Sequence, residues 1–588
     1  MKHFLLSVAA MFVLVTAYAG PVDFATAKKL AESVINNGDM PVEKTVEEVV
    51  LSAEVNSRMS VSPVEAPAFY VFEAEEGGFA IVSGEDAFPE VIGYSTDGQI
   101  SRNGSMPDAL VAYLESYSRY VEDVRKGLVD APATDRVFSV GTPVVAPMCV
   151  TKWGQGAPYN NLCPMVNMRH TPVGCVATAM AQVMYYHKYP ERAKGYISYY
   201  TGNTSIGNIS MDFYSDSHIY HWDEMKATSA EMSDSASRAS VARLSYDCGV
   251  ATKMQYNPSG SGTSDAQCAR ALRDIFGYSK ATVSYVMRDW IGTQDEWNGL
   301  VLKELNEGRP VVYCGSSLKG TGGRDAAGHA FIFDGYDSEG NVHVNWGWDG
   351  SSDGYYNIVT LDMGTYAFTE DQSMIFGITP GAEEEAAAQC RLLVFHNSPK
   401  ASVVSTSLDK RISMSLQEFY NYDADAHSWK CGVGLFDKHG RFLTCVGKEV
   451  SHVAYDALTG YTSGPTVFVK IPSKLPNGEV LPEGDYALRY IINEKGFTLE
   501  DGSEDWILPY NYGGEKANWL PVEIKGSKAY LDQVSSGIED VEVDGATVLS
   551  SEYFDLNGRP VVAPADGQIV VEKQRLTNGK FRSVKRRF

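Results

Sequence analysis

Two stretches of low structural propensity divide this chain and limit what it can fold into. The segment Gly127–Pro147 carries Pro132, Pro143 and Pro147 and few periodic apolar positions, which is typical of an exposed linker. The segment Gly381–Gln389 is acidic and rich in alanine. Because a single hydrophobic core stops growing at roughly 250–300 residues, we expect the 588 residues to form three or four domains.

The region before the first linker, residues 20–145, has the pattern of a small α+β domain. A helical segment precedes short strands around Ala68–Tyr94 and a second helix around Asp108–Lys126. Residues 146–380 mix amphipathic helices with strands and many glycine and aromatic residues. We therefore predict two consecutive α+β domains.

The region after the second break is rich in predicted strands. Short alternating runs such as Cys431–Phe436 and Tyr486–Ile492 predict a β-sandwich-like domain over 390–535. In the last module, residues 536–588, the Asn557-Gly558 and Asn578-Gly579 pairs predict two short hairpins. The expected fold class is α+β, with a β-rich C-terminal part.

The first 19 residues have the pattern of a secretion signal. Lys2 supplies positive charge, Phe4–Val15 is apolar, and Ala17-Tyr18-Ala19 offers a cleavage site. An uncleaved membrane anchor is the alternative, but the apolar run is shorter than the roughly 20 residues that a spanning helix needs. We expect residues 1–19 to be a signal peptide and the mature chain to be secreted or displayed at the cell surface.

Composition excludes several classes of partner and cofactor. The formal charge of -24 would repel nucleic acid and anionic lipid. The nine cysteines are scattered without the CxxC pairs of zinc sites. Asp337, Asp349 and Asp353 are too loosely spaced for a calcium loop and are interpreted as solvated turn carboxylates. We predict no metal, no organic cofactor and no nucleic-acid partner.

Cys175 is the cysteine with unusual surroundings. It opens a run of helix formers that extends to His187, and Pro172 and Gly174 precede it. At a helix start, unpaired backbone N–H groups and the positive end of the helix dipole favour thiolate over thiol. The alternative is a small apolar residue at a helix start. The pattern makes Cys175 a candidate nucleophile.

A nucleophilic cysteine needs a base, and His329 is the candidate. His187 is excluded because twelve helical residues displace it by roughly 18 Å along the axis. Gly328–Gly335 is an apolar strand that opens with Gly-His and continues through a turn into Val342–Trp346. The alternative is a hydrogen-bonded histidine at a strand edge.

The expected hairpin register suggests a third member of the site. A turn centred near Ser338 puts position 347 opposite His329 and makes Asn345 a diagonal neighbour on the same face. The Asn345 amide could then orient the imidazole. Upstream, Gln155 lies between two glycines and could form an oxyanion hole with the Cys175 backbone N–H, although an exposed loop glutamine is the alternative.

Four segments resemble the streptopain-like family of papain-like cysteine peptidases, in the same order. They are WGQGAPYN, GCVATAMAQVMYYHKYP, GHAFIFDGY and HVNWGWDGSSDGYY. The resemblance implies Cys175 as nucleophile, His329 as base and acid, Gln155 in the oxyanion hole, and Asn345 with Trp346 supporting the histidine.

The resemblance extends beyond the catalytic motifs. Phe69–Gly98 looks like the family's inhibitory propeptide, which implies that residues 20–145 act as an intramolecular inhibitor until they are cut off. Tyr256–Ser264 resembles a stretch near the family's substrate cleft. The final NGR and NGK elements look like sorting tails of exported bacterial proteins, so cell-surface attachment or tail removal stays open.

The function expected from these observations is a secreted cysteine endopeptidase that is made as a zymogen and acts on protein or peptide substrates. Two alternatives remain at this point. Another Cys/His enzyme, such as a cell-wall amidase or a transglutaminase, would use the same thiolate attack on an amide. A non-catalytic adhesin or binding protein would use the peptidase fold as a scaffold and the β-rich region for binding.

Overall fold

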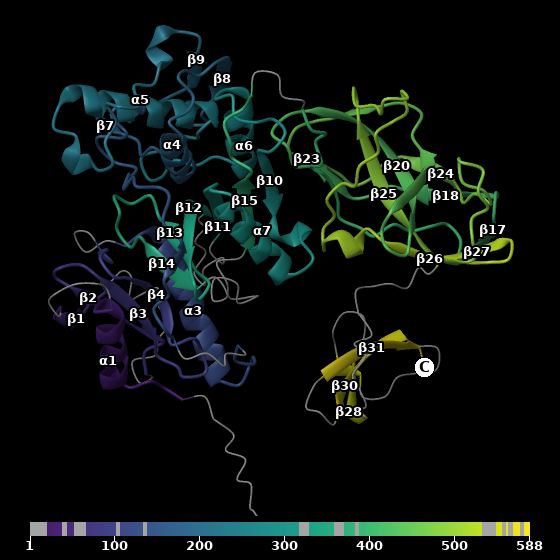
Figure 1. Ribbon diagram of the computed structural model, residues 1–588, viewed down its shortest axis with the longest axis horizontal. Coiled ribbons are helices and arrows are strands. Elements are labelled where there is room, and N and C mark those ends of the chain that lie inside the picture. Colours follow the sequence, from purple (N-terminus) through teal and green to yellow (C-terminus); the bar gives the residue numbers. More distant parts are fainter. Residues whose placement is uncertain are drawn as a thin grey trace, which may run out of the picture. The chain divides into compact units, whose positions relative to one another are not determined.

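The chain forms two compact units, residues 1–388 with 423–425 and residues 389–422 with 426–588. The computed structural model describes residues 20–37, 44–51, 66–101, 106–132, 138–316, 328–357, 370–382 and 387–531, and the backbone of 548–554, 560–561, 569–576 and 581–587 (Figure 1). The predicted signal segment 1–19 lies outside these residues.

The first unit combines helices with one large sheet. Its helices are α1 (Phe24–Ile35), α3 (Asp108–Arg125), α4 (Cys175–His187), α5 (Ser235–Ala251), α6 (Asp265–Asp274) and α7 (Gln294–Asn306). Its strands are β1 (Val46–Glu48), β2 (Phe69–Ala74), β3 (Phe79–Ser83), β4 (Val91–Ser95), β5 (Pro143–Val145), β6 (Met165–Val166), β7 (Arg169–His170), β8 (Tyr196–Tyr200), β9 (Asn208–Asp212), β10 (Ser284–Met287), β11 (Val311–Ser316), β12 (Gly328–Asp337), β13 (Asn341–Asn345), β14 (Gly354–Asn357) and β15 (Glu370–Phe376).

The N-terminal α+β domain confirms the sequence prediction. The Asp23 side chain caps α1 by accepting from the Thr26 backbone N–H. Ala27, Ala31 and Val34 form the buried face of α1, at the spacing of an amphipathic helix. This face packs against β2 and β3, as Figure 1 shows. The second helix, α3, ends one residue from its predicted end.

The N-terminal strands and the strands of the middle region belong to the same sheet. Its order is β1-β2-β3-β4-β14-β13-β12-β11-β15-β10, with β5 paired to β12 off this path. The two regions join where β4 pairs with β14, through Tyr94 opposite Tyr355 and Gly93 opposite Tyr356. A Cβ on Gly93 would lie 2.4 Å from the Tyr356 ring, so this junction requires glycine.

The end of the predicted linker is ordered, which differs from the expectation of an open linker. Pro143–Val145 forms β5 and pairs with Tyr336 and Asp337 of β12. This edge of β12 is open because β11 pairs only as far as Phe333. The residues of β5 nevertheless remain largely exposed to solvent.

Helix α4 is the central helix of the middle region. It begins at Cys175, as predicted, and every residue from Val176 to Met184 is buried. A helix that is buried all round is surrounded by other elements, and here these include α5, α6, β11 and β12. The nucleophile candidate therefore lies at the tip of a firmly packed helix.

The second unit is rich in strands, as predicted. Its strands are β16 (Leu393–Phe395), β17 (Ser405–Ser407), β18 (Arg411–Ser415), β19 (Phe419–Asn421), β20 (His427–Asp437), β21 (Phe442–Lys448), β22 (Val453–Tyr455), β23 (Thr459–Tyr461), β24 (Thr466–Lys470), β25 (Gly484–Glu494), β26 (Leu520–Lys525), β27 (Lys528–Leu531), β28 (Val548–Phe554), β29 (Pro560–Val561), β30 (Ile569–Leu576) and β31 (Phe581–Arg587). Three sheets of β16–β27 share one buried core that includes Trp429, Val469 and Leu488, a sandwich-like arrangement.

The last module contains the two expected hairpins. β28 pairs with β29 and β30 with β31, both antiparallel, on either side of the predicted Asn-Gly turns. The turn residues themselves lie outside the described residues. Within the described ranges, no helix has the length and apolar character that crossing a membrane requires.

Candidate active site

The turn before α4 presents Cys175 in a fixed position. Gly174 has φ 95°, and a Cβ there would lie 2.7 Å from the Met254 sulfur and 3.0 Å from the Ser261 carbonyl oxygen. Only glycine fits this turn without a shift. The Ser261 hydroxyl donates to the Pro172 carbonyl oxygen at 2.7 Å. The loop Tyr256–Ser264 thus contacts the segment that leads into the nucleophile candidate.

The Cys175 thiol is half-buried. Burial raises its pKa, a hydrogen bond from the Ala330 backbone N–H lowers it, and the nearby Asp265 carboxylate raises it again. The amide of Val176 at the helix start also lowers the pKa, as predicted, but burial outweighs this effect. The net shift of the Cys175 pKa is therefore upward.

His329 lies on the strand that contacts the nucleophile candidate. It is the second residue of β12, pairs with Gly315 of β11, and directly precedes Ala330, whose backbone N–H lowers the Cys175 pKa. The fold thus brings the strand of His329 to the tip of α4, although the two segments are far apart in sequence.

The register of the β12–β13 hairpin differs from the predicted one. Asn345 pairs with Ile332 instead of Phe331, because the turn is centred on Glu339 instead of Ser338 and a bulge between Phe333 and Gly335 then moves the register back by one residue. A slip of one residue reverses the face of every side chain, so Asn345 shares a face with Ile332 and not with His329. The register prediction was wrong by one residue.

Trp346, and not Asn345, lies on the face of the hairpin that His329 shares. Its ring centroid is 4.8 Å from that of Phe331, and the two-residue period puts Phe331 on the same face as His329. The indole N–H donates to the Ser352 carbonyl oxygen at 3.1 Å, and the Trp346 backbone N–H donates to Asp353 Oδ1 at 2.9 Å. These two bonds hold the indole in place.

The Asn345 side chain makes its hydrogen bonds within the protein core. Its Nδ2 donates to the Thr151 carbonyl oxygen at 2.8 Å, and its Oδ1 accepts from the Gly347 N–H at 3.1 Å and from Gln182 Nε2 at 3.0 Å. Asn345 therefore fastens its strand to α4 and to the segment before Trp153.

Gln155 lies next to the turn that leads into α4. Its backbone carbonyl oxygen accepts from the Val173 N–H at 3.0 Å, and its side chain is half-buried. The loop of Gln155 is thus fixed two residues before Cys175 begins the helix. Around Cys175, no three described His, Cys, Asp or Glu side chains bring ligand atoms within 4.8 Å of one another.

The N-terminal domain contacts the same hairpin from the other end. Tyr94 donates its hydroxyl proton to Asp337 Oδ2 at 2.8 Å, and Asn341 Nδ2 donates to the same oxygen at 2.8 Å. Asp337 is only 1% exposed. The interpretation of Asp337 as a solvated turn carboxylate was wrong, since it is a buried contact between the N-terminal domain and the middle region.

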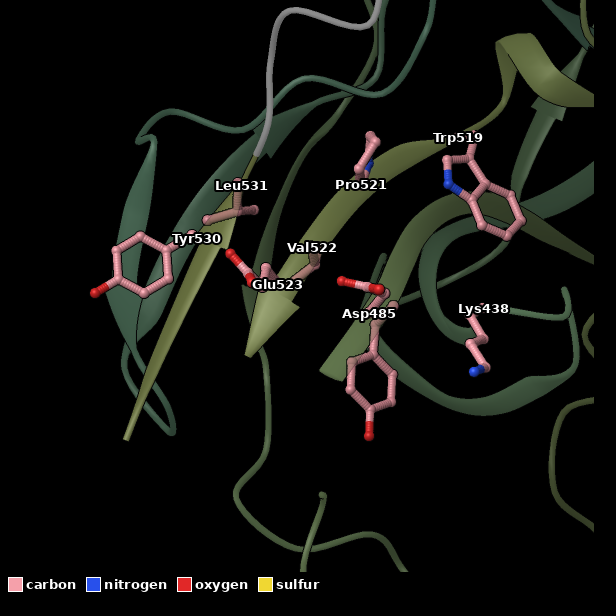
Figure 2. A pocket seen from close by; sticks show the side chains of 9 residues that line it. Lys438, Asp485, Trp519, Pro521, Val522, Glu523, Tyr530 and Leu531 are labelled. Carbon is pink, nitrogen blue, oxygen red and sulfur yellow. The ribbon is translucent and has the colours of Figure 1, made fainter. Parts of the chain in front are cut away.

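The second unit has a separate cavity of about 400 Å³ (Figure 2). Asp485, Glu523 and Tyr530 lie on three adjacent strands, and Trp519 and Lys438 line the cavity beside them. None of its lining residues is a cysteine or histidine.

Three side chains make contacts that the sequence did not predict. Gln182 bonds to Asn345, Asp265 acts on the Cys175 thiol, and Asp337 meets the N-terminal domain. For Gln182 a signal existed, because it is a polar residue in an otherwise apolar run. No local pattern marks Asp265 or Asp337.

Comparisons with known proteins identify two regions of the chain. Residues 153–356 match the model of the peptidase C10 family, and residues 19–121 match that of the Spi protease inhibitor. Streptopain of Streptococcus pyogenes is 32% identical over 334 residues, covering 53% of this chain and 80% of streptopain. The thiol protease/hemagglutinin PrtT of Porphyromonas gingivalis is 31% identical over 386 residues, covering 62% of this chain and 43% of PrtT.

Among solved structures, a prointerpain A fragment of Prevotella intermedia is 31% identical. It is covered completely, matches 58% of this chain, and has a TM-score of 0.47. The coverage of streptopain, together with the two matched models, decides the family. The chain belongs to the peptidase C10 family, as a streptopain-like cysteine peptidase zymogen with an N-terminal Spi-type inhibitor domain as its propeptide.

Proposed function

We propose that this peptidase is a secreted endopeptidase in which Cys175 is the nucleophile and His329 the general base and acid. One observation carries this assignment: α4, which begins at Cys175, packs against β12, the strand of His329, and the backbone N–H of the next residue, Ala330, lowers the Cys175 pKa. The start of the helix and the histidine-bearing strand thereby lie together. The resemblance of four motifs in the same order supports the same pair.

The proposed reaction proceeds through an acyl-enzyme. His329 takes the thiol proton, and the Cys175 thiolate attacks the scissile carbonyl carbon. The Gln155 side-chain amide and the Cys175 backbone N–H donate to the oxyanion. Protonated His329 then gives its proton to the leaving amine as the C–N bond breaks, leaving a thioester. Water, deprotonated by His329, attacks the thioester and releases the new carboxylate.

The supporting residues have different proposed roles. Trp346 orients His329, because it packs on Phe331 on the face that His329 shares. Asn345 acts indirectly, by fastening the strand that leads into Trp346. These roles replace a direct bond from Asn345 to the imidazole, which the observed register disfavours.

The propeptide is proposed to keep the enzyme latent, and a cut between Gly127 and Pro147 to activate it. The buried Tyr94–Asp337 contact and the β4–β14 pairing hold the propeptide on the peptidase. The exposed residues of β5 offer a protease an accessible segment. We propose domain limits of 20–145, 146–380, 390–535 and 536–588. Substrates would carry a hydrophobic residue before the cleaved one, as the family resemblance implies, and the last module could attach the protein to the cell surface.

Casein hydrolysis by the chain from Gly20 onward tests the proposal. Under reducing conditions the wild type is expected to cut casein and to convert its own precursor to a smaller form, whereas Cys175→Ala does neither. Release of cell-wall peptides without casein cleavage would instead favour an amidase. Binding to cells that is unchanged in Cys175→Ala, with no cleavage by either protein, would favour an adhesin.

A further inference from the structure

Gln182 is a buried polar side chain on the nucleophile helix. It lies seven residues after Cys175, two turns along the same face of α4 and roughly 10 Å down the axis, and its exposure is 0%. Its Oε1 accepts from the Trp153 backbone N–H at 3.2 Å, and its Nε2 donates to Asn345 Oδ1 at 3.0 Å. A buried amide at this position needs partners, because leaving it unsatisfied destabilises the fold.

The two amides of Gln182 and Asn345 bond reciprocally. Asn345 Nδ2 also donates to Gln182 Oε1, at 3.3 Å. With the bonds to Thr151 and Gly347, both donors and both acceptor positions of the Asn345 amide are used. A fully satisfied buried network favours one arrangement of the elements it joins.

Three segments that carry proposed active-site residues meet at this network. Helix α4 presents Cys175, the loop that begins at Trp153 presents Gln155, and the strand that ends at Asn345 leads into Trp346. We propose that Gln182 is a positioning residue, whose amide fixes these three segments relative to one another. This inference rests on the proposed function of Cys175, Gln155 and Trp346.

A single substitution separates the hydrogen bonds of Gln182 from its volume. Gln182→Met keeps the length of the side chain and removes every bond. A misplacement of about 1 Å in an active site costs about 100-fold in rate, so we expect kcat of the matured protein on a peptide substrate to fall by about 100-fold, with KM within about twofold of wild type.

Gln267→Met is the matched control. Gln267 is also a buried helical glutamine, 9% exposed, but its Oε1 accepts from Arg270 Nε on its own helix, α6. We expect a comparable loss of Tm with kcat unchanged. Equal kcat losses in Gln267→Met and Gln182→Met, or a kcat of Gln182→Met within twofold of wild type, would overturn the positioning role.

Gln182→Glu gives a readout that a purely structural role would not move. Below its pKa, which burial raises, the new carboxyl group can donate to Asn345 Oδ1 and accept from Trp153. Above its pKa it has no donor. The ratio of its kcat to that of wild type is therefore expected to rise as pH falls, whereas the ratio for Gln182→Met stays flat. Parallel ratios for the two variants would contradict the proposal.

Alkylation of Cys175 by iodoacetamide keeps this inference separate from the peptidase assignment. The rate is measured against pH, with Cys175→Ala as the blank for the other cysteines. We expect the midpoint of the profile to shift in Gln182→Met and to remain in Gln267→Met. If the wild type cleaves no peptide, the proposed function fails, but a shifted alkylation profile still supports positioning by Gln182, and coincident profiles refute it.

Discussion

Two junctions of the same sheet differ in how firmly they are made. β11 and β12, which carry the histidine strand to the nucleophile, pair through six consecutive residues from Val311 to Ser316. β4 and β14, which join the propeptide to the peptidase, pair through two residues only. The strand at the active site is thus fixed by extensive main-chain pairing, whereas the β4–β14 junction has little of it.

Side-chain contacts add to the short main-chain pairing at the propeptide junction. The Tyr94 hydroxyl reaches the buried Asp337, and the Tyr94 ring stacks on Tyr355 with centroids 5.5 Å apart. Burial and the Asp337 charge raise the pKa of Tyr94, which keeps the phenol protonated as a donor. A few specific contacts can be lost together once the linker is cut, so this junction suits an inhibitor that must leave.

The largest effect on activity is expected at Gly174, in the turn that leads into Cys175. Gly174→Ala would place a Cβ 2.6 Å from Met254 Cε at φ 95°, so the turn must shift and Cys175 with it. We expect kcat/KM on a peptide substrate to fall about 100-fold. The control is Gly299→Ala, where nothing lies within 4 Å of the new Cβ. Full activity of Gly174→Ala would show that the turn tolerates a side chain.

The next effect is expected at the propeptide junction itself. Gly93→Val would drive its side chain into the Tyr356 ring, and overpacking of this kind costs about 1–3 kcal/mol. We expect a Cys175→Ala precursor with this change to be converted several-fold faster by a trace of mature wild-type enzyme. Gly299→Ala in the same precursor should leave the rate unchanged. Equal conversion rates for all three precursors would mean that the β4–β14 pairing does not limit release.

A smaller effect is expected from removal of one hydroxyl group. Tyr94→Phe keeps the ring stack and removes the donor to Asp337, which retains its bond from Asn341 Nδ2. The loss is about 1 kcal/mol, so conversion should accelerate less than in Gly93→Val. Thermal unfolding of the Cys175→Ala precursor measures the same loss directly. An unchanged Tm together with an unchanged conversion rate would contradict a holding role for this contact.

The sequence could predict what depends on local pattern. The helix start at Cys175 and the β12–β13 hairpin were both predicted, because glycine, helix formers and alternating apolar residues mark them. The register of that hairpin was missed, since the turn is centred one residue later than expected and the bulge after Phe333 has no local signal. The burial of Asp337 was missed because its partner, Tyr94, comes from a different domain.

The chemistry of Cys175 shows the same limit. A helix start predicts a lowered thiol pKa, and the expected amide bond from Val176 is present. The opposing burial comes from elements that are distant in sequence, so no pattern around Cys175 could reveal it. Tertiary context therefore reverses the direction of the pKa shift that the helix start alone predicts.

The smallest effect concerns the pH dependence of stability near the propeptide junction. Burial raises the pKa of Asp353 to about 7, from an ordinary value of 3.8. Burial lowers the pKa of His343, but the charge and hydrogen bond of Asp334 and the charges of Asp353 and Asp97 together raise it more, so the net shift is upward. For Asp353, the ordinary pKa of 3.8 and the folded pKa of about 7 mean that folding takes up a proton between pH 4 and 7. Protonated His343 contributes fully to the stability of the folded protein below the pKa that it has in the unfolded chain. This contribution is lost as pH rises through its pKa in the folded protein.

Both groups make the folded precursor less stable as pH rises, and Asp353→Asn isolates one of them. Asparagine is neutral at every pH and can still accept from the Trp346 N–H. In the Cys175→Ala precursor, the Tm of Asp353→Asn minus that of the parent is therefore expected to increase from pH 5 to pH 8. Asp216→Asn, at a side chain 92% exposed, is the control and should show a constant difference. A difference that falls with pH would mean that Asp353 is charged and stabilising in the folded precursor, and that the propeptide junction is tightest where we expect it to be weakest.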